Sequence, residues 1–153
     1  MIVRKRKAFT LIELLIVVVI VGIVALVVMP RGHEIMVNNQ VRSAKQEIAA
    51  TLAVAKASAI HSGRPARFVR NGNVMHVRQD VGAQFDTIGA PVNMMRSYRV
   101  HVESNPDTIR FDSRGFALGI PNAYQTVRIS RGTRRDSVCV TRFGRIITEG
   151  RCQ

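Results

Sequence analysis

An apolar segment of 21 residues near the start of the chain, Phe9 to Met29, most constrains how this protein can fold. Thr10 and Glu13 are its only polar residues, a cluster of four basic residues (Arg4–Lys7) precedes it, and Pro30 follows it. As a helix the segment would be about 31 Å long, which matches the hydrocarbon thickness of a bilayer. The sequence therefore predicts one membrane-spanning helix, with the basic cluster in the cytoplasm and the rest of the chain beyond the membrane.

Two simpler interpretations of this segment explain less of it. A secretory signal peptide ends in small residues of the A-x-A kind, whereas this core ends in Val-Val-Met-Pro-Arg. A plain anchor explains the basic cluster and the apolar run but leaves Glu13 without a reason. An ionisable residue at the centre of a spanning helix costs about 3 kcal/mol, and less near an end, so such residues usually face a partner. A cut between Ala8 and Phe9 would create an α-amino group one turn from Glu13, and a neighbouring chain could present its own amino group to that carboxylate.

The stretch KAFTLIELLIVVVIVGIVALVVMP resembles the class III signal of type IV pilins and of the related pseudopilins of type II secretion. The resemblance implies that a prepilin peptidase cuts between Ala8 and Phe9 and that the new N-terminus is methylated. It also implies that Glu13, five residues after the cut, helps subunits to assemble into a filament. The helix proline of the family falls at Pro30. The sequence departs from the family at Ala8, because the residue before the cut is usually glycine.

The composition indicates a basic exported domain. The formal net charge is +13, of which four charges belong to residues 1–8, so a chain cut after Ala8 keeps +9. Nineteen of the 23 basic residues are arginine, which binds phosphate and carboxylate through two parallel hydrogen bonds. This bias favours an anionic partner. The alternative is a basic periplasmic surface without a dedicated ligand.

Two cysteines, Cys139 and Cys152, lie in the last fifteen residues. On the oxidising side of a membrane they are expected to form a disulfide, which would stabilise the fold by roughly 3 kcal/mol. Two free thiols are the alternative. No C-x-x-C motif is present, so neither redox nor zinc chemistry is indicated.

The pattern of apolar residues predicts an α+β fold in which a long N-terminal helix packs on a C-terminal antiparallel β-sheet domain. An apolar stripe at helical spacing ends near Ser62-Gly63, and Pro30 is expected to kink or unwind the helix between its membrane half and its amphipathic half. Strands are then expected from Ala66 onward, starting with a hairpin around Asn71-Gly72. Residues 79–95 are expected to form a loop, and a strand is expected to begin at Tyr98. The stripe comprises Val41, Ala44, Ile48, Leu52, Ala55 and Ala59.

The segments FDSRGF and CVTRFGRIITEGRC resemble the C-terminal sheet of one pilin branch, the GspH/FimT family of minor pilins and pseudopilins, including a closing cysteine pair. With this resemblance, the expected organisation is a leader at 1–8, a transmembrane and assembly helix at 9–30, and a globular domain at 31–153. The globular domain is expected to contain a helix at 31–62 and a β-domain at 66–153.

No catalytic constellation is visible in the sequence. The four histidines lack metal-ligand spacing, and no G-x-S-x-G, P-loop or dinucleotide fingerprint occurs. We therefore expect neither an enzyme nor a cofactor nor a metal site.

The C-terminal region is the other functional signal, because residues 110–153 hold nine arginines and three acids, a net charge of +6. Several guanidinium groups on a rigid loop suit a phosphate backbone, whereas the few aromatic residues do not indicate single-strand specificity. Some FimT-like minor pilins bind extracellular DNA through a C-terminal arginine motif, and the stretch from Gly144-Arg145 to Gly150-Arg151 resembles a looser form of it. Alternatively, the arginines cover the solvent face of the sheet or contact acidic neighbours in a filament. The candidate DNA-binding residues are Arg131, Arg134, Arg135, Arg142, Arg145 and Arg151.

The expected protein is a minor type IV pilin that captures DNA for natural transformation. It would sit in the inner membrane as a single-pass protein with a periplasmic C-terminal domain and then enter a pilus. Its partners would be other pilins, the prepilin peptidase, the inner membrane and DNA. One alternative is a GspH-like pseudopilin that primes a type II secretion pseudopilus. Another is a filament-initiating minor pilin that binds only other pilins.

Overall fold

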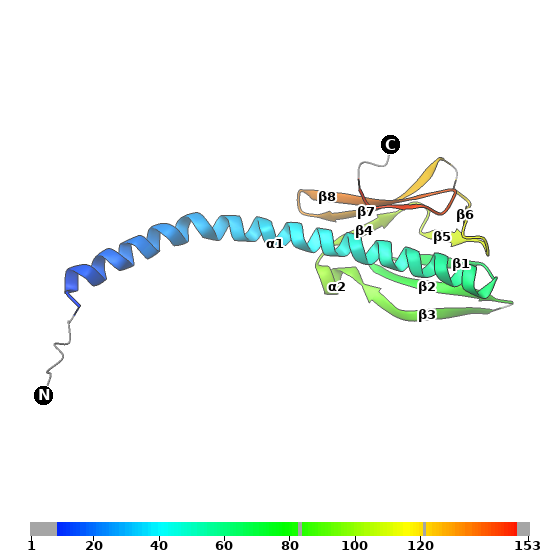
Figure 1. Cartoon of the computed structure of the whole chain (residues 1–153), viewed down its shortest axis with the longest axis horizontal. Coiled ribbons are helices and arrows are strands. Elements are labelled where there is room, and N and C mark those ends of the chain that lie inside the picture. Colours follow the sequence, from blue (N-terminus) through cyan, green and yellow to red (C-terminus); the bar gives the residue numbers. More distant parts are fainter. Residues whose placement is uncertain (1–8, 83, 121, 150–153) are drawn as a thin grey trace, which may run out of the picture. The chain divides into compact units, whose positions relative to one another are not determined.

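The computed structural model describes residues 9–82, 84–120 and 122–149 (Figure 1). The predicted leader, residues 1–8, lies outside the described residues, as do Arg151 and Cys152. The chain divides into two compact units, Met1–Met36 and Val37–Gln153. Helix α1 (Leu11–Ser62) begins in the first unit and ends in the second.

The start of α1 is capped by Thr10. The backbone N–H of Glu13 donates a hydrogen bond to Thr10 Oγ1 over 3.3 Å, which places Glu13 at the third helical position of a Thr-x-x-Glu capping pattern. A carboxylate in the first turn also interacts favourably with the helix dipole. The glutamate therefore has a local role in starting the helix, in addition to any contact with a partner.

The apolar side chains of α1 between Leu11 and Leu26 are exposed around the whole helix. A helix that is apolar on every side requires an apolar environment or other chains around it. Among the residues that the structure describes, no helix combines the length and the apolarity needed to cross a membrane. The helix runs through Pro30 without interruption, so the chain does not unwind there.

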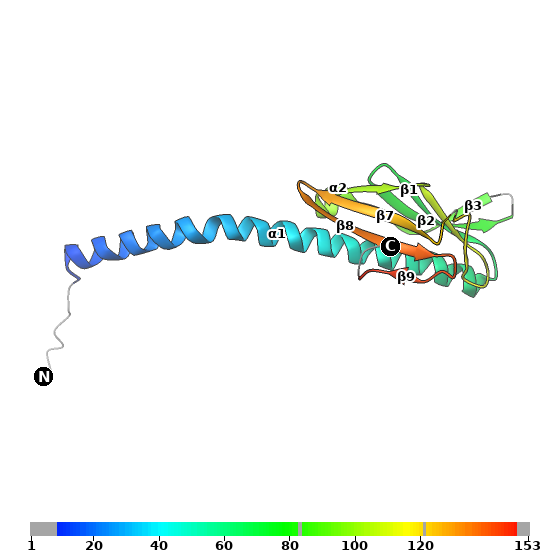
Figure 2. The same cartoon turned by 90° about the horizontal axis from the view of Figure 1, so that it is seen from above.

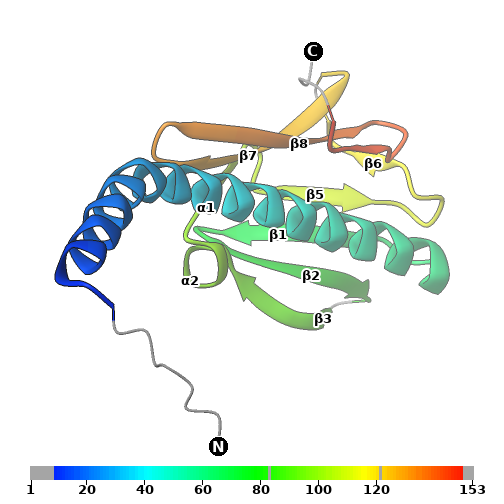
Figure 3. The same ribbon diagram turned by 60° about the vertical axis from the view of Figure 1, so that its left-hand side comes forward.

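The part of α1 in the second unit is amphipathic. The predicted stripe is confirmed, since all six of its side chains are buried, and the helix ends at Ser62, as expected. Gly63 follows with a φ of +65°, the left-handed conformation that closes many helices. Figure 3 shows both sheets behind this part of α1, with β7 and β8 on one side of its axis and β2 and β3 on the other.

A five-stranded antiparallel sheet has the strand order β3-β2-β1-β5-β6. The predicted hairpin at Asn71-Gly72 joins β1 to β2. The expected loop at residues 79–95 is wrong, because this segment contains the end of β2 and all of β3. Strand β3 is an edge strand with mostly exposed side chains, so it shows no buried alternation and accommodates Gly89 and Pro91. The strands are β1 (Ala66–Asn71), β2 (Val74–Val81), β3 (Gln84–Asn93), β5 (Thr108–Phe111) and β6 (Ala117–Leu118).

A four-stranded antiparallel sheet has the order β4-β7-β8-β9. The strand expected from Tyr98 begins later, because a short helix, α2 (Met94–Tyr98), precedes it. Asn93 caps α2, because its side chain accepts a hydrogen bond from the Arg96 N–H over 3.1 Å. This N-cap was missed in the sequence, because the strand-like alternation around Val100 favoured a strand. The strands are β4 (His101–Ser104), β7 (Tyr124–Arg131), β8 (Arg134–Thr141) and β9 (Ile146–Ile147).

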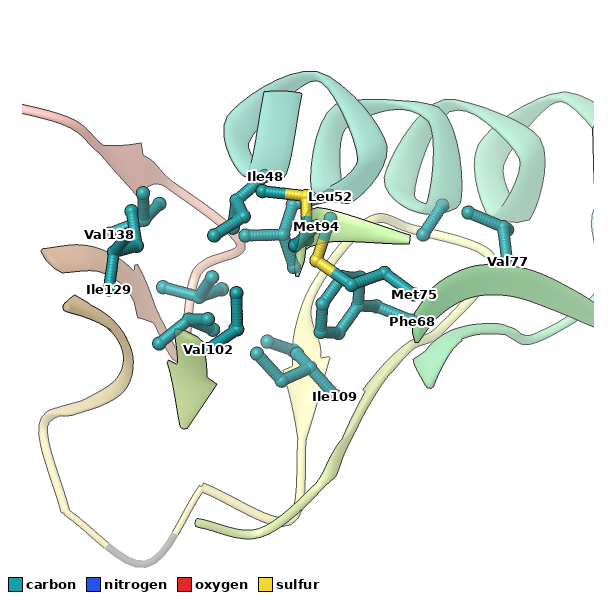
Figure 4. Packing of buried hydrophobic residues seen from close by; sticks show 14 of the residues in the cluster. Ile48, Leu52, Phe68, Met75, Val77, Met94, Val102, Ile109, Ile129 and Val138 are labelled. Atoms are coloured by element: carbon teal, nitrogen blue, oxygen red, sulfur yellow. The ribbon is translucent and has the colours of Figure 1, made fainter. Parts of the chain in front are cut away.

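One hydrophobic core joins the amphipathic part of α1 to both sheets. Figure 4 shows Ile48 and Leu52 of α1 close to Met94, with Phe68 and Ile109 from the larger sheet and Ile129 from the smaller one in the same cluster. Since both sheets bury their inner faces in this core, their outer faces and their turns are the surfaces available for binding. The fold is thus α+β: a long N-terminal helix followed by an antiparallel β-domain.

Candidate nucleic-acid interface

The structure separates the predicted DNA-binding arginines into two groups. Arg131, Arg134 and Arg135 lie at the β7–β8 turn, whereas Arg142 and Arg145 lie at the β8–β9 turn. These turns are at opposite ends of β8, and the eight residue-to-residue steps from Arg134 to Arg142 span about 26 Å of extended chain. The arginines therefore do not form one cluster.

The three arginines at the β7–β8 turn differ in exposure. Arg131 and Arg134 are directly opposite each other, and Arg135 faces Ser130. Arg131 is half-buried, and its Nη1 atom is buried without a hydrogen-bond partner in the described part of the chain. Arg131 is thus less available to a ligand than Arg134 and Arg135, which are exposed.

Acidic side chains lie close to the β7–β8 turn. Arg134 and Arg135 line a groove of about 570 Å³ between α1 and β8, together with Arg42, Asp136 and Glu149. Asp136 accepts hydrogen bonds from Lys45 Nζ at both carboxylate oxygens, over 2.8 and 2.9 Å. The mixed charge of this groove weakens its attraction for a polyanion.

The β8–β9 turn presents basic and aromatic side chains together. Arg142 and Arg145 are exposed on either side of Phe143, which is 77% exposed. The Arg142 Nε donates to the Asn122 carbonyl over 3.0 Å, and the Arg145 N–H donates to Thr141 Oγ1 over 3.2 Å. An exposed aromatic ring and exposed guanidinium groups in one turn can contact both a base and its neighbouring phosphates.

Contacts with other segments hold the β8–β9 turn in place. Gly144 has a φ of +68°, and its carbonyl accepts a hydrogen bond from Lys56 Nζ over 3.0 Å. A Cβ added to Gly144 would overlap the carbonyl oxygen of Gly115, so the two backbones are in direct contact. The Ala117 N–H donates to the Arg142 carbonyl over 2.9 Å. Figure 2 shows β9 beside the last turns of α1.

The segment FDSRGF forms the other side of this contact. Asp112 Oδ1 accepts from the N–H groups of Arg114 and Phe116, over 3.0 and 2.8 Å. Desolvation acts to raise the pKa of Asp112, but the hydrogen bonds from Phe116 and Arg114 and the Arg114 charge outweigh it, so the pKa is lowered. The turn directs Phe116 towards Phe143, with ring centroids 6.2 Å apart in an edge-to-face arrangement.

Arg114 is not among the DNA-binding residues predicted from the sequence. Its guanidinium lies 5.4 Å from the centroid of the Phe116 ring, so it belongs to the same surface as Phe143. The residues Asp-Ser-Arg-Gly are typical of a turn, and Arg114 lies in one. The sequence did not indicate that this turn contacts the β8–β9 turn, which lies 29 residues further along the chain.

Of the remaining predicted site residues, some lie within the described residues and others do not. Glu13 lies in the first turn of α1, four residues after Phe9, whereas Ala8 is outside the described residues. Cys139 is disulfide-bonded and no free cysteine occurs in the described ranges, but Cys152 lies outside them, so the Cys139–Cys152 pairing stays a prediction. Within residues 9–82, 84–120 and 122–149, no group of three or more His, Cys, Asp or Glu side chains is arranged to hold a metal.

Two family models match the chain. The model described as "Prokaryotic N-terminal methylation motif" matches residues 3–29. The model described as "Type II transport protein GspH" matches residues 44–144, which include most of the second part of α1 and all strands from β1 to β8.

The chain is also similar to known proteins of Pseudomonas aeruginosa. Two proteins, each named "Fimbrial protein", are 35% identical to it over 85 residues, which are 56% of this chain and 53% of each relative. The chain thus spans about half the length of the curated relatives it matches.

Two crystal structures of the type IV minor pilin FimU from strain PAO1 share the fold. The structure in space group P21 matches with a TM-score of 0.61 and 16% identity, over 74% of this chain and 90% of that one. The structure in space group P65 matches with a TM-score of 0.55 and 16% identity, over 71% of this chain and 92% of that one. At this identity, the likeness concerns the fold alone.

Proposed function

Since the chain belongs to the family of type II transport protein GspH, we propose that it is a minor type IV pilin that binds extracellular DNA, and not an enzyme. The prepilin peptidase cuts it between Ala8 and Phe9, and the new N-terminus is methylated. Residues 9–30 anchor it in the inner membrane with its β-domain in the periplasm, and the same helix later inserts among other pilins in a filament. The match to the methylation motif and the pilin fold support this life cycle.

Glu13 is the residue proposed to guide filament assembly. It is an exposed carboxylate four residues after Phe9, in the part of α1 whose large apolar side chains are exposed. Replacing Glu13 by Ala should leave the protein in the membrane fraction but remove it from sheared pili, because the amino group of the neighbouring subunit loses its counter-ion. Glu34→Ala is the matched control, since Glu34 is also exposed on α1. Normal incorporation of the Glu13 variant would refute the assembly role.

DNA binding is proposed for the β8–β9 turn. The observation that carries this proposal is a turn held by Lys56 and Gly115 that presents Arg142, Phe143 and Arg145 to solvent. A turn already fixed in position loses little conformational entropy when a ligand binds. Its side chains provide positive charge for phosphates and one aromatic face for a base.

The test uses the full-length chain in neutral detergent and a fluorescent DNA duplex at several salt concentrations. Binding should weaken with salt, with log K falling by about 0.9 per log unit of salt for each phosphate contacted. The double variant Arg142→Gln/Arg145→Gln should bind more weakly than the control Arg134→Gln/Arg135→Gln, which removes the same charge from the other end of β8. Absence of binding by the unmodified chain at low salt would refute the DNA-binding proposal. Equal loss in both variants would mean that the binding site has been misplaced.

A second candidate function follows from the matching family itself, which is that of a type II transport protein. In that case the protein is a minor pseudopilin that helps to start a secretion pseudopilus. Deletion of the gene distinguishes the two functions: a pseudopilin is needed for export of folded proteins, whereas a DNA-binding pilin is needed for transformation.

A further inference from the structure

Three arginines lie side by side on the outer face of the five-stranded sheet. In the strand register, Arg67 of β1 is directly opposite Arg78 of β2 on one side and Arg110 of β5 on the other. Because residues directly opposite each other project from the same face of a sheet, their guanidinium groups form a row across three adjacent strands. None of these three residues is among the candidates predicted from the sequence.

This arginine row is an unfavourable arrangement for the isolated fold, since like charges directly opposite each other destabilise a sheet. One carboxylate, Asp80, compensates part of the charge. It lies 2.7 Å from Arg67 Nη2 and 3.7 Å from Arg110 Nη2. Arg78 is exposed and forms no ion pair within the described ranges of the chain. The row therefore keeps an excess of positive charge.

Arg67, at the centre of the row, is held in position but incompletely bonded. Its guanidinium carbon lies 4.0 Å from the centroid of the Phe85 ring, and its side chain is 22% exposed. Its Nε atom is buried without a hydrogen-bond partner in the described residues. Arg110 is 49% exposed, so at least two of the three guanidinium groups are accessible to an anion.

The arginine row leads towards the β8–β9 turn. Arg110 is opposite Leu118 of β6, and the neighbouring Ala117 donates its N–H to the Arg142 carbonyl over 2.9 Å. Figure 3 shows β6 close to the end of β8. From β2 across β1, β5 and β6 to this turn there are four strand spacings of about 4.8 Å, or about 19 Å in all. Arg142 is therefore nearer to this row than to the β7–β8 turn, which lies about 26 Å away along β8.

We propose that the DNA-binding surface is a band that crosses the strands, from Arg78 through Arg67 and Arg110 to Arg142, and that it binds the phosphates of duplex DNA. This inference rests on the proposed DNA-binding function and assigns its contact surface. A linear array of like charges suits a polymer that repeats its own charge, and about 19 Å corresponds to five or six base pairs of duplex at 3.4 Å each. Guanidinium groups bind phosphate oxygens in pairs, which explains arginine rather than lysine at these positions.

The first experiment removes two exposed charges of the band. Arg78→Gln/Arg110→Gln is compared with Arg42→Gln/Arg96→Gln, two arginines that are exposed on α1 and α2. The full-length chain and a 20-base-pair duplex are used. The band variant should show a salt dependence shallower by about two phosphate contacts, whereas the control keeps the slope of the unmodified chain. Equal slopes in the two variants overturn the proposal.

The second experiment adds net charge to the band. Asp80→Asn removes the carboxylate that Arg67 and Arg110 share, and Asp86→Asn removes one from exposed strand β3. Asp80→Asn should tighten duplex binding severalfold, and Asp86→Asn should change it less. Equal effects would show that only overall charge matters and would overturn the band.

The outcomes separate this proposal from the proposed function. If the unmodified chain does not bind the duplex, DNA binding and the band both fail. If Arg142→Gln/Arg145→Gln weakens binding but Arg78→Gln/Arg110→Gln does not, DNA binding stands and the band alone fails. If poly-glutamate of equal charge competes as well as duplex, the band recognises acidic chains in general, and its assignment to DNA is wrong.

Discussion

The two turns at the ends of β8 are made from similar residues but are held in different ways. Each places arginines beside a glycine with positive φ, +56° at Gly132 and +68° at Gly144. No atom of the described residues lies within 4 Å of the position that a Cβ would take at Gly132, whereas at Gly144 that position is occupied by the Gly115 backbone. Local sequence is therefore enough to make a turn, but tertiary contacts decide whether the turn is fixed.

This difference has a consequence for binding. The β8–β9 turn also receives a hydrogen bond from Lys56 and a ring contact from Phe116, so its side chains start from a restricted set of positions. Ordering a side chain at an interface costs about 0.5–1.5 kcal/mol, and a turn that is already held avoids part of that cost. In the part of the chain that the structure describes, the β7–β8 turn has no comparable backbone contact at its glycine, and acidic groups lie in the groove beside it.

Alanine at the two glycines should produce the largest effect and the clearest contrast. Gly132→Ala should destabilise by about 1 kcal/mol, because a Cβ is disfavoured at positive φ. Gly144→Ala adds a steric overlap with Gly115 and should cost about 3 kcal/mol or more. Thermal unfolding of the full-length chain should show a decrease in Tm of roughly 10 °C for Gly144→Ala and about 3 °C for Gly132→Ala. Equal decreases would contradict a backbone contact between Gly144 and Gly115.

Sequence patterns predicted helices and strands better than they predicted the contacts between them. The stripe from Val41 to Ala59 and the hairpin at Gly72 are governed by residues a few positions apart, and both are confirmed. Strand β3 was missed because an exposed edge strand lacks the alternation that marks a buried face. The sequence therefore revealed which segments bury a face, and it revealed less about strands that remain largely in solvent.

At the proposed interface, the sequence predicted even less, because the interface depends on contacts between distant segments. Alternation along β1, β2 and β5 is enough to place Arg67, Arg78 and Arg110 on outward positions. Their alignment depends on β1 pairing with β5, which lies about 40 residues further along and leaves no local mark on the sequence. The contact of Gly115 with Gly144 likewise depends on the packing of two loops. Such juxtapositions require the registers of the whole sheet.

Loss of the Lys45–Asp136 ion pair should have an intermediate effect and should concern the β7–β8 side. Both side chains are partly buried, 17% and 34% exposed, and the ammonium group bonds both carboxylate oxygens. Asp136→Asn should cost about 1.5–3 kcal/mol, because it weakens charged hydrogen bonds and leaves Lys45 uncompensated. Chemical denaturation measures this loss, with Asp86→Asn as the exposed control.

A second substitution tests the cause of that loss. Lys45→Met combined with Asp136→Asn removes both charges, so the double variant should lose less stability than the two single changes added together. Strict additivity would show that the two side chains do not interact. Neither change should alter the stability difference between Gly144→Ala and Gly132→Ala, because the pair lies near the β7–β8 turn.

Acid should produce the smallest effect, and it should act on the β8–β9 side. The folded pKa of Asp112 is lowered from the ordinary value of 3.8, because hydrogen bonds from Phe116 and Arg114 outweigh the desolvation that acts to raise it. A carboxyl group with a lowered folded pKa stabilises the fold above its unfolded pKa, and this contribution disappears as the pH falls through the folded pKa. Stability should therefore decrease below about pH 4 through Asp112, and Asp112→Asn should show a weaker decrease.

Amide hydrogen exchange at pH 3 and pH 6 can locate this acid effect. Protonated Asp112 is a poorer acceptor for the N–H groups that shape the FDSRGF turn, and Gly144 rests against that turn through Gly115. After correction for intrinsic rates, amides around Gly144 should lose protection at pH 3, whereas those around Gly132 should change little. If both turns lose protection equally, the docking of the β8–β9 turn does not depend on the Asp112 charge. Loss confined to the β8–β9 turn would show that one carboxylate sets the rigidity of the segment that presents Arg142 and Arg145.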